Sequence, residues 1–381
     1  MKKIILAPDS FKGTISSLDI CNIMGAAARR SFPDCEIIRI PVADGGEGTV
    51  ESMLAAAGGE KIAVTVKGPR MSEIESFYGM LPDGKTAVIE MAAAAGLPMV
   101  RGCENPMDTT TYGVGMLIAH ALRKGARKIL LGLGGSCTND GGCGAAAALG
   151  VVFKNKDGQP FIPVGGTLEQ IASIDLMAAQ QKLAGVQIRI MCDVDNPLWG
   201  ENGAAYIFGP QKGADAEKVR LLDRGLRVLG SLLEELRPGV EIMPGAGAAG
   251  GMGAGMCAML GAELVSGIDG VLDTVGFDDL LEGCDMVFTG EGRIDGQSLR
   301  GKVVFGICRR AKAAGVPVCA VVGDALDDQL QDAAERGLCA VFTTNRRAVA
   351  WEKAKLTAVQ DLTCAVENLF SFAAALRGGR V

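Results

Sequence analysis

Six carboxylate side chains lie just beyond three short apolar segments of the chain. They are Asp44 and Glu47, Asp193 and Asp195, and Glu291 and Asp295. Carboxylates in such loops can hold a magnesium ion and can orient or deprotonate a hydroxyl group, as phosphoryl transfer requires. Each of them alone is also compatible with a solvated loop charge, so the prediction of a site depends on their concentration beside apolar segments and glycines.

Four cationic side chains occur in loops of the same kind. They are Lys12, Lys212, Arg293 and Lys302. A phosphoryl-transfer site needs cations where negative charge accumulates in the transition state. The combination of carboxylates, cations and glycine therefore favours a site for a phosphorylated ligand.

The segment 134–142, GGSCTNDGG, follows an apolar run and precedes an alanine-rich segment that begins near Cys143. Backbone N–H groups at the start of a helix, with no Cβ atoms in the way, can bind phosphate. This predicts a phosphate-binding loop, with Asp140 available to hold magnesium. A tight turn into a buried helix is the structural alternative. The candidate phosphate-binding residues of this segment are Gly134, Gly135, Ser136, Thr138 and Asn139.

Two further glycine patterns are weaker. Residues 245–250, GAGAAG, fit the dinucleotide-binding pattern by letter, but no clear strand follows and close helix packing or a second anion loop is the better interpretation. Residues 296–302 nearly match a P-loop, yet Val303 stands where a Ser or Thr must bind magnesium. The second segment is therefore not a Walker ATPase motif, although Lys302 remains a candidate phosphate-binding cation.

The pattern of the chain predicts alternating strands and helices as the elements that position these residues. Six short Ile- and Val-rich runs end in glycine and polar residues, as strands buried on both faces of a parallel sheet do. They lie at 4–7, 37–42, 129–133, 188–192, 286–288 and 318–322. Helical patterns occupy 16–31, 217–237, 303–314 and 329–337. Because ligands of open parallel sheets bind beyond the carboxyl ends of the strands, we expect the six ends to form one site.

The middle of the chain shows a different pattern of predicted strands. Residues 74–80 and 86–90 flank Pro82-Asp83-Gly84 and predict a β-hairpin. Antiparallel strands at this point suggest an inserted domain. We expect a discontinuous Rossmann-like domain of residues 1–69 and 276–381, with an inserted α/β domain at 70–275.

Composition excludes several other classes of protein. The net charge is −6 at pH 7 and the sequence pI is about 5.1, which argues against a nucleic-acid partner. Glycine, at 54 of 381 residues, is about twice its usual share, without a collagen period. The uncharged segment 245–262 contains seven glycines and predicts no membrane span.

Cysteine and histidine usage narrows the chemistry further. The 12 cysteines show no zinc spacing, and no signal peptide is recognised, so reduced thiols in a cytoplasmic enzyme are expected. The single histidine, His120, lies in an apolar helical run and is expected on a helix surface or in the core.

Several long motifs resemble the bacterial glycerate kinase family, the ATP-dependent glycerate 2-kinases. They occur in order and cover most of the chain from Ala7 to Lys302. Cys137 stands where the family pattern has a small residue such as alanine, and the tail after Arg346 resembles the family less distinctly. The motifs are APDSFKGTISS, VADGGEGT, IEMAAAAGLP, NPMDTTTYGVG, GLGGSCTNDGG, CDVDNPLWGENGAAYIFGPQKGA, PGAGAAGGMGAG and TGEGRIDGQSLRGK.

The resemblance implies a two-domain α/β enzyme with its site in the cleft. It also implies Mg²⁺- and ATP-dependent transfer of the γ-phosphoryl group to D-glycerate, giving 2-phosphoglycerate. A homodimer is the assembly that we consider, with no membrane or nucleic-acid partner. An NAD-dependent hydroxy-acid dehydrogenase and a non-catalytic anion-binding module remain the alternatives.

Within this reading, Asp193 or Asp295 accepts the proton of the glycerate hydroxyl. Lys12 stabilises the transferring phosphoryl group or anchors the substrate carboxylate. The other expected roles are substrate binding by Ser10, Asp44, Gly45, Glu47 and Arg293, nucleotide binding by Lys212 and Lys302 with the loop 134–142, and metal binding by Asp140, Asp195 and Glu291.

Overall fold

The protein is described here by a computed structural model that covers residues 1–376 except 44, 47, 295–302, 326–331 and 348. Its chain divides into two compact units. Unit 1 comprises Met1–Asp44, Glu51–Gly58 and Ser266–Val381, and unit 2 comprises Gly45–Val50 and Gly59–Val265. The predicted site residues Asp44, Glu47, Asp295 and Lys302 lie outside the described residues.

Unit 1 is built on a parallel sheet that has five strands among the described residues, in the order β16-β14-β12-β1-β2. The chain leaves β1 toward β2 and later returns to the other side of β1 as β12. This reversal is the topological switch point of a doubly wound sheet, where ligands of such folds bind. The strands are β1 (Lys3–Pro8), β2 (Glu36–Arg39), β12 (Met286–Gly290), β14 (Val318–Val322) and β16 (Leu338–Thr343).

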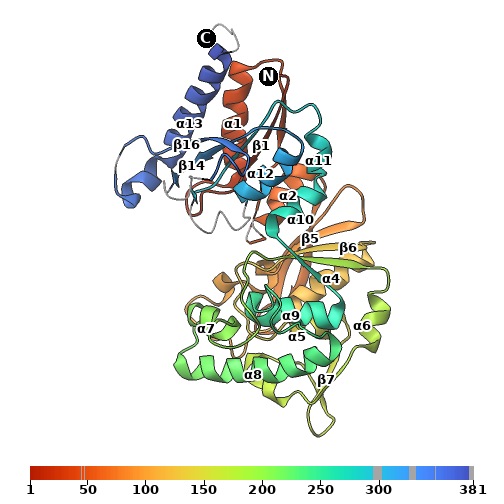
Figure 1. The fold of residues 1–381 in the computed structure, drawn as a ribbon. Helices are drawn as coiled ribbons and strands as arrows, with labels where there is room; N and C mark the ends of the chain where they lie inside the picture. The colour runs from red at the N-terminus through yellow and green to blue at the C-terminus, as the bar shows by residue number, and fades with distance from the viewer. Residues whose placement is uncertain (44, 47, 295–302, 326–331, 348, 377–381) are drawn as a thin grey trace. The chain divides into compact units, whose positions relative to one another are not determined.

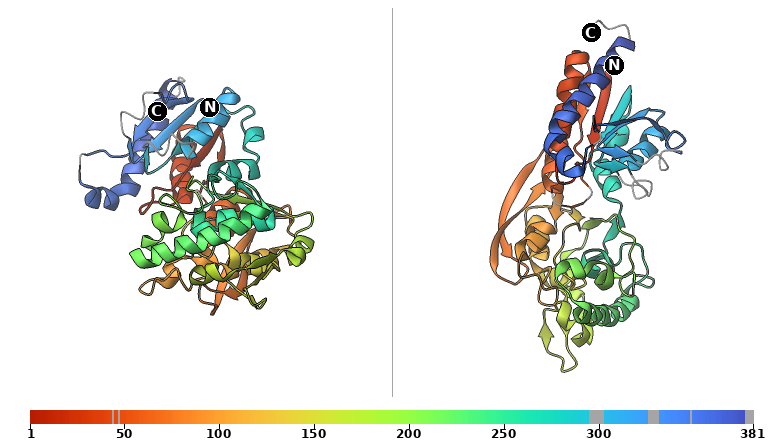
Figure 2. Two further views of the ribbon diagram at one scale, coloured as in Figure 1. Left: turned by 60° about the horizontal axis from the view of Figure 1, so that its bottom comes forward. Right: turned by 90° about the vertical axis from the view of Figure 1, so that its left-hand side faces the viewer.

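Helices cover both faces of this sheet. Ile4 and Leu6 point to the face that α1 and α13 cover, and these two helices lie side by side (Figures 1 and 2). α12 packs on the sheet and also on α10. The helices assigned to unit 1 are α1 (Ser17–Ser31), α10 (Gly267–Thr274), α11 (Phe277–Leu280), α12 (Val303–Ala313) and α13 (Trp351–Leu376), while α2 (Thr49–Ala57) begins in unit 2 and continues in unit 1.

The helix predictions for unit 1 have mixed outcomes. The helix expected at 16–31 is confirmed as α1, with the Ser16 side chain accepting a hydrogen bond from the Asp19 backbone as an N-cap does. The helix expected at 303–314 is α12. The helix expected at 329–337 is wrong over 332–337, which forms turns, because Ala333 is the only buried side chain of that stretch and no apolar stripe exists to pack.

Unit 2 contains a mixed sheet of six strands among its described residues, in the order β11-β10-β6-β5-β4-β3. The predicted hairpin is confirmed by the antiparallel pairing of β4 with β5. β5, β6, β10 and β11 are parallel. The strands are β3 (Glu60–Lys67), β4 (Glu73–Met80), β5 (Thr86–Glu90), β6 (Lys128–Gly132), β10 (Gln187–Met191) and β11 (Glu263–Val265), with a small antiparallel sheet of β7 (Val152–Lys154), β8 (Pro160–Phe161) and β9 (Ser173–Asp175).

The helices of unit 2 pack in layers on one another. α4 lies on β3 to β5, α5 packs on α4, and α8 packs on α9 (Figure 1). The helix expected at 217–237 is confirmed as α8. The helices are α3 (Ala92–Ala95), α4 (Tyr112–Arg123), α5 (Cys143–Leu149), α6 (Met177–Lys182), α7 (Ala204–Phe208), α8 (Ala216–Leu236) and α9 (Ala248–Leu260), with short 3₁₀ helices at Leu97–Val100, Gly165–Gln170 and Pro210–Lys212.

The observed division differs from the expected boundaries by about ten residues on each side. Unit 2 resumes at Gly59 instead of residue 70, because β3 pairs with β4 along its whole length. It ends at Val265 instead of residue 275, because α10 packs on α12 of unit 1. The α/β fold class with parallel sheets is as predicted.

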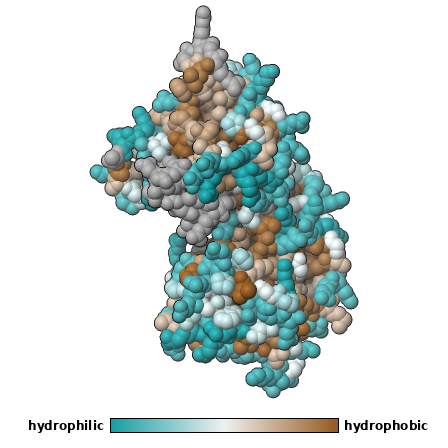
Figure 3. Space-filling view, viewed as in Figure 1, coloured by the Kyte–Doolittle hydropathy of each residue, from teal (hydrophilic) through white to brown (hydrophobic). Residues whose placement is uncertain are grey.

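The surface agrees with the composition. Polar and charged residues cover most of the face shown in Figure 3, and apolar residues form smaller patches among them. No helix among the described residues is long and apolar enough to cross a lipid bilayer.

Candidate active site

The loop after β1 presents Lys12 at the carboxyl end of the unit 1 sheet. The loop closes on itself, since the Phe11 N–H donates to the Ile15 carbonyl at 2.9 Å and the Ile15 N–H donates back to Phe11 at 3.1 Å. Both side chains are buried in the core, whereas Lys12 is exposed. Anchoring by these two apolar residues therefore fixes the backbone from which the Lys12 ammonium group extends.

The segments after β12 and β14 run together beyond the sheet. A Cβ atom on Gly290 would lie 2.1 Å from the Val321 carbonyl oxygen, so a glycine is required where the two strands end. Further on, β13 (Arg293–Ile294) pairs with β15 (Asp324–Ala325), and Arg293 Nε lies 3.4 Å from Asp324 Oδ2. This extension positions the Glu291, Arg293 and Asp324 side chains at one place.

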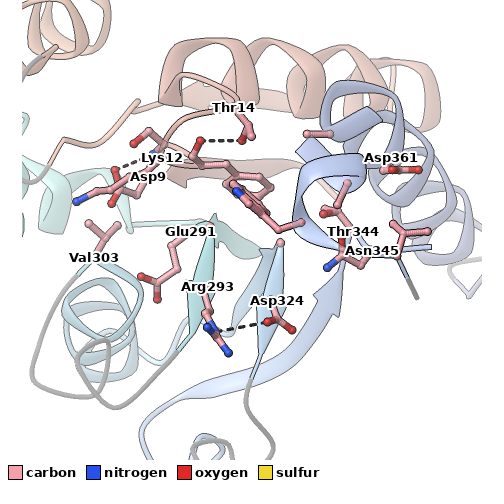
Figure 4. Close-up of a pocket in the computed structure, with 18 residues that line it drawn as sticks. Asp9, Lys12, Thr14, Glu291, Arg293, Val303, Asp324, Thr344, Asn345 and Asp361 are labelled. Carbon is pink, nitrogen blue, oxygen red and sulfur yellow. Dashed lines mark hydrogen bonds and ion pairs between the residues drawn. The ribbon is translucent and has the colours of Figure 1, made fainter. Parts of the chain in front are cut away.

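A cavity of about 580 Å³ opens at these strand ends, at the switch point between β1 and β12. Figure 4 shows side chains of the loop after β1 together with those that follow β12, β14 and β16. Asp9 and Glu291 are buried in its wall, and the Asp9 carboxylate accepts a hydrogen bond from the Ser10 N–H. Of the residues predicted from the sequence, the cavity brings together Ser10, Lys12, Glu291 and Arg293.

The glycine-rich loop 134–142 belongs to unit 2 and is tightly packed. The Gly134 N–H donates to the Gly45 carbonyl at 3.0 Å, and a Cβ atom on Gly134 would lie 2.5 Å from Gly46 Cα. The structure therefore places two of the predicted residues, Gly45 and Gly134, against each other. Gly135 is exposed, whereas residues 136–146 are all buried.

Asp140 accepts backbone hydrogen bonds at the start of α5. Its buried carboxylate accepts hydrogen bonds from the N–H and hydroxyl groups of Thr111 and from the N–H groups of Gly142 and Gly144. Burial raises the pKa of Asp140, and these hydrogen bonds oppose the rise. Because Asp140 occupies the N–H groups at the start of α5, the geometry does not favour the predicted phosphate cradle there or a magnesium ion on Asp140.

Lys212 is a fully buried cation beside this loop. Its ammonium group donates to Ser136 Oγ and to the Thr138 carbonyl, both at 2.7 Å. Burial lowers the pKa of Lys212 from 10.5 to about 8, and the nearby Cys137 and Asp140 oppose this shift. Three residues predicted to bind nucleotide, Ser136, Thr138 and Lys212, are therefore in direct contact.

Several polar atoms near this loop are buried without a hydrogen-bond partner in the part of the chain that the structure describes. They are both side-chain polar atoms of Asn139, the Thr138 hydroxyl and Asn105 Oδ1. Buried polar groups in folded proteins are normally hydrogen-bonded, so such atoms indicate a bound water or ligand. This observation keeps Thr138 and Asn139 as candidate binding residues of unit 2.

Asp193 and Asp195 follow β10 in unit 2. Asp193 is half-buried and Asp195 is exposed. The end of β10 packs on Gly45, because a Cβ atom on Gly45 would lie 3.0 Å from the Met191 Cβ atom. The roles of Asp193 and Asp195 stay predictions, as does the expectation that all six strand ends form one site.

The glycine-rich segment 245–250 has a structural role. Gly250 packs closely on the loop 134–142, since a Cβ atom there would lie 2.2 Å from the Thr138 carbonyl oxygen. This supports close packing over dinucleotide binding for the segment 245–250. His120 lies on α4 with its Nδ1 atom 3.1 Å from the Tyr78 hydroxyl, and all 12 cysteines are unpaired thiols.

Sequence reasoning missed part of the cavity wall. Thr344, Asn345, Trp351, Ala354 and Asp361 line it, and the last three belong to α13. The segment after Arg346 carries no recognisable motif, so only the run of helix-forming residues that ends near Leu376 could have indicated a helix there.

Carboxylate oxygens suit magnesium, and Asp9 and Glu291 provide them in the cavity wall. Among the described residues, no three His, Cys, Asp or Glu side chains group closely enough to hold a metal ion alone. Magnesium in phosphoryl-transfer sites is usually held by one or two carboxylates together with substrate phosphates and water. The donor set of the cavity fits that mode of binding.

Comparisons with known proteins by sequence and by structure give relatives of the same kind. The sequence profile of the glycerate kinase family matches residues 4–374. The glycerate kinase of Bacillus cereus is 44% identical over 369 residues, covering 96% of this chain and 97% of that protein. The glycerate 2-kinase of Escherichia coli is 43% identical and covers 90% of each chain.

A solved structure extends the likeness to the fold. The crystal structure of a protein from Salmonella typhimurium LT2, described as a glycerate kinase 2, superposes with a TM-score of 0.87 at 39% sequence identity and covers 99% of both chains. The present chain is an enzyme, a phosphotransferase, and it belongs to the glycerate kinase family.

Proposed function

We propose that this protein transfers the γ-phosphoryl group of ATP to the 2-hydroxyl group of D-glycerate, in a magnesium-dependent reaction in the cytoplasm. The products are 2-phosphoglycerate and ADP. The observation that carries the proposal is the cavity at the switch point of unit 1, which combines Lys12 and Arg293 with the buried carboxylates of Asp9 and Glu291. A family match over nearly the whole chain supports glycerate as the acceptor.

The proposed reaction forms a bond between the acceptor oxygen and the γ-phosphorus atom, and it breaks the bond from that phosphorus to the β–γ bridging oxygen. The hydroxyl proton goes to a carboxylate, for which Asp193 is our candidate among the described residues. Lys12 stabilises the negative charge of the transferring group. Magnesium, when bound, would be held by Asp9 and Glu291 together with phosphate oxygens, and it would neutralise phosphate charge.

A coupled assay of ADP release tests the proposal. With ATP and magnesium, we expect ADP release that depends on D-glycerate and is much slower with L-glycerate. The same protein mixed with NADH and a small oxo acid should leave the nicotinamide absorbance unchanged, because segment 245–250 packs against the loop 134–142. ADP release that is indifferent to glycerate, or hydride transfer from NADH, would contradict the proposal.

Mass measurement in solution tests the assembly. A homodimer is the expected state, and the low pI of about 5.1 supports the absence of a nucleic-acid partner.

A further inference from the structure

The wall of the unit 1 cavity has chemically different parts. One part carries the charged residues Asp9, Lys12, Glu291 and Arg293 beside the first residue of α12, Val303 (Figure 4). α12 has 11 residues, and the positive end of its dipole favours an anion beside that residue. This part therefore offers cations and a helix start to a phosphorylated group.

Another part of the cavity wall is apolar and aromatic. Val349, Trp351, Ala354 and Ala358 line it together with Phe11. Trp351 is 60% exposed, although large aromatic side chains are usually well buried. An exposed indole on a cavity wall is suited to stacking on a flat ring.

Polar groups complete the wall on the side of the cavity away from Lys12 (Figure 4). Asp361, Thr344 and Asn345 line the cavity, and the first of these holds one carboxylate oxygen 2.6 Å from the Thr357 hydroxyl. Carboxylate and amide oxygens of this kind accept hydrogen bonds from sugar hydroxyl groups. The wall thus combines aromatic, hydrogen-bonding and cationic groups.

One face of α13 carries large side chains in the core and small ones at the cavity, which leaves space in the apolar part of the cavity. In its second half this face buries Leu362, Val366 and Phe370 in the core. In its first half the same helical spacing brings Ala354 and Ala358 to the cavity. Small residues at these two positions leave a space that larger apolar residues would fill.

The size of the cavity selects among ligands. Pockets of about 300–1,000 Å³ hold drug-sized molecules. A three-carbon acid would leave most of a 580 Å³ cavity empty, and it has no ring to lie against Trp351. A nucleoside triphosphate has a flat base, a sugar with two hydroxyl groups and a polyanionic chain, and the cavity wall offers matching groups for each of them.

The geometry points to this cavity as the binding site of the nucleoside triphosphate, with its base on Trp351 and its phosphates toward Lys12 and Arg293. The inference rests on the proposed use of ATP as phosphoryl donor. It assigns the nucleotide to unit 1, whereas the sequence alone suggested the loop 134–142 of unit 2.

Trp351 fluorescence tests the position of the base. The chain has two tryptophans, so the Trp199→Phe variant leaves Trp351 as the only indole. In this variant we expect saturable quenching by ADP without glycerate or magnesium. Inorganic tripolyphosphate, which has no base, should weaken ADP binding by competition without quenching Trp351. Equal quenching by both ligands, or none by ADP, would overturn the inference.

A pair of variants on α13 tests the site independently of the probe. Ala354→Leu should raise the calorimetric Kd for ADP at least about tenfold, because the new side chain occupies the cavity. Leu356→Phe on the same helix, at a side chain that is 80% exposed, should leave the Kd unchanged. Circular dichroism and the melting temperature of both variants check that they fold. If Ala354→Leu binds ADP normally while Ser136→Ala loses binding, the nucleotide belongs to unit 2 and the inference is wrong.

The inference and the proposed function fail differently. If glycerate-dependent ADP release is normal but Ala354→Leu changes neither the Kd for ADP nor the KM for ATP, the cavity assignment falls and the activity stands. If ADP quenches Trp351 and Ala354→Leu weakens its binding but glycerate is not phosphorylated, the nucleotide site stands and the proposed function falls.

Discussion

At the scale of single residues, Lys212 has an unusual environment because it is an ammonium group buried in unit 2. Burial holds its pKa near 8, below the ordinary value of 10.5. Between these two values the unfolded chain binds the proton more tightly than the folded chain, so this group makes the free energy of unfolding rise with pH. The cost of burying the charge is fully present below pH 8 and is lost above about 10.5.

Lys212→Met should remove this dependence. We expect the wild-type protein to gain about 2–3 kcal/mol of stability relative to the variant between about pH 7 and pH 10. Urea unfolding of both proteins at each pH measures the difference, in which the other titrating groups cancel. A stability difference that stays constant over this range would show that Lys212 keeps an ordinary pKa.

Asn139 provides a second residue-scale test, because neither of its side-chain polar atoms has a hydrogen-bond partner among the described residues. Asn139→Leu should raise the free energy of unfolding by about 1 kcal/mol, since it removes unsatisfied buried groups, and it should lower the kinase activity about tenfold or more. Asn155→Leu is the matched control. Asn155 Oδ1 accepts hydrogen bonds from the Asp157 and Gln159 N–H groups, so this change should cost stability and leave activity intact. A destabilised but fully active Asn139→Leu protein would contradict the expectation.

Asp193 carries the proposed proton transfer. Asp193→Asn keeps the shape of the side chain but cannot accept the hydroxyl proton, so kcat should fall by ~10²–10⁴. Steady-state kinetics with D-glycerate and ATP measure the loss. Asp157→Asn, at an exposed turn, should leave kcat unchanged. Near-normal turnover of Asp193→Asn would remove Asp193 from the mechanism.

At the scale of elements, α13 contributes side chains to both the core and the cavity. One of its two phenylalanines is buried and the other is exposed. Phe370 is fully buried, with its ring centroid 4.8 Å from that of Phe288 on β12, whereas Phe372 is 59% exposed. Phe370→Ala should cost about 3–5 kcal/mol of stability, and Phe372→Ala should cost less than about 1 kcal/mol. Denaturant unfolding of the pair measures both values. Equal losses would mean that α13 does not pack on the sheet as described.

Elements were predictable from the sequence where a local signal was strong. Ser16 and the apolar stripe that follows it predicted α1, and short Ile- and Val-rich runs predicted the parallel strands. β3 was missed although Ile62, Val64 and Val66 alternate with the exposed residues Ala63 and Thr65, a pattern typical of a half-exposed strand. The contact between the Asp140 carboxylate and Thr111, about 30 positions away, was not predictable from the sequence, because it depends on tertiary structure.

At the scale of the whole molecule, the α/β class was predictable, but the strand order was not. The order β2-β1-β12-β14-β16 brings residues near position 10 beside residues near 291 and 324, and this depends on long-range pairing. The cavity wall shows the same limit. Trp351 and Ala354 belong to a helix without a motif, and only tertiary structure brings them to the strand ends.

The central claim is that the 2-hydroxyl group of glycerate receives the phosphoryl group of ATP. Phosphorus and carbon NMR of a reaction of the purified protein with ATP, magnesium and D-glycerate tests it directly. We predict one new phosphate ester, coupled to the proton on C2, formed in a one-to-one ratio with ADP. An ester on C3, or ADP that accumulates with inorganic phosphate and no ester, would contradict the account.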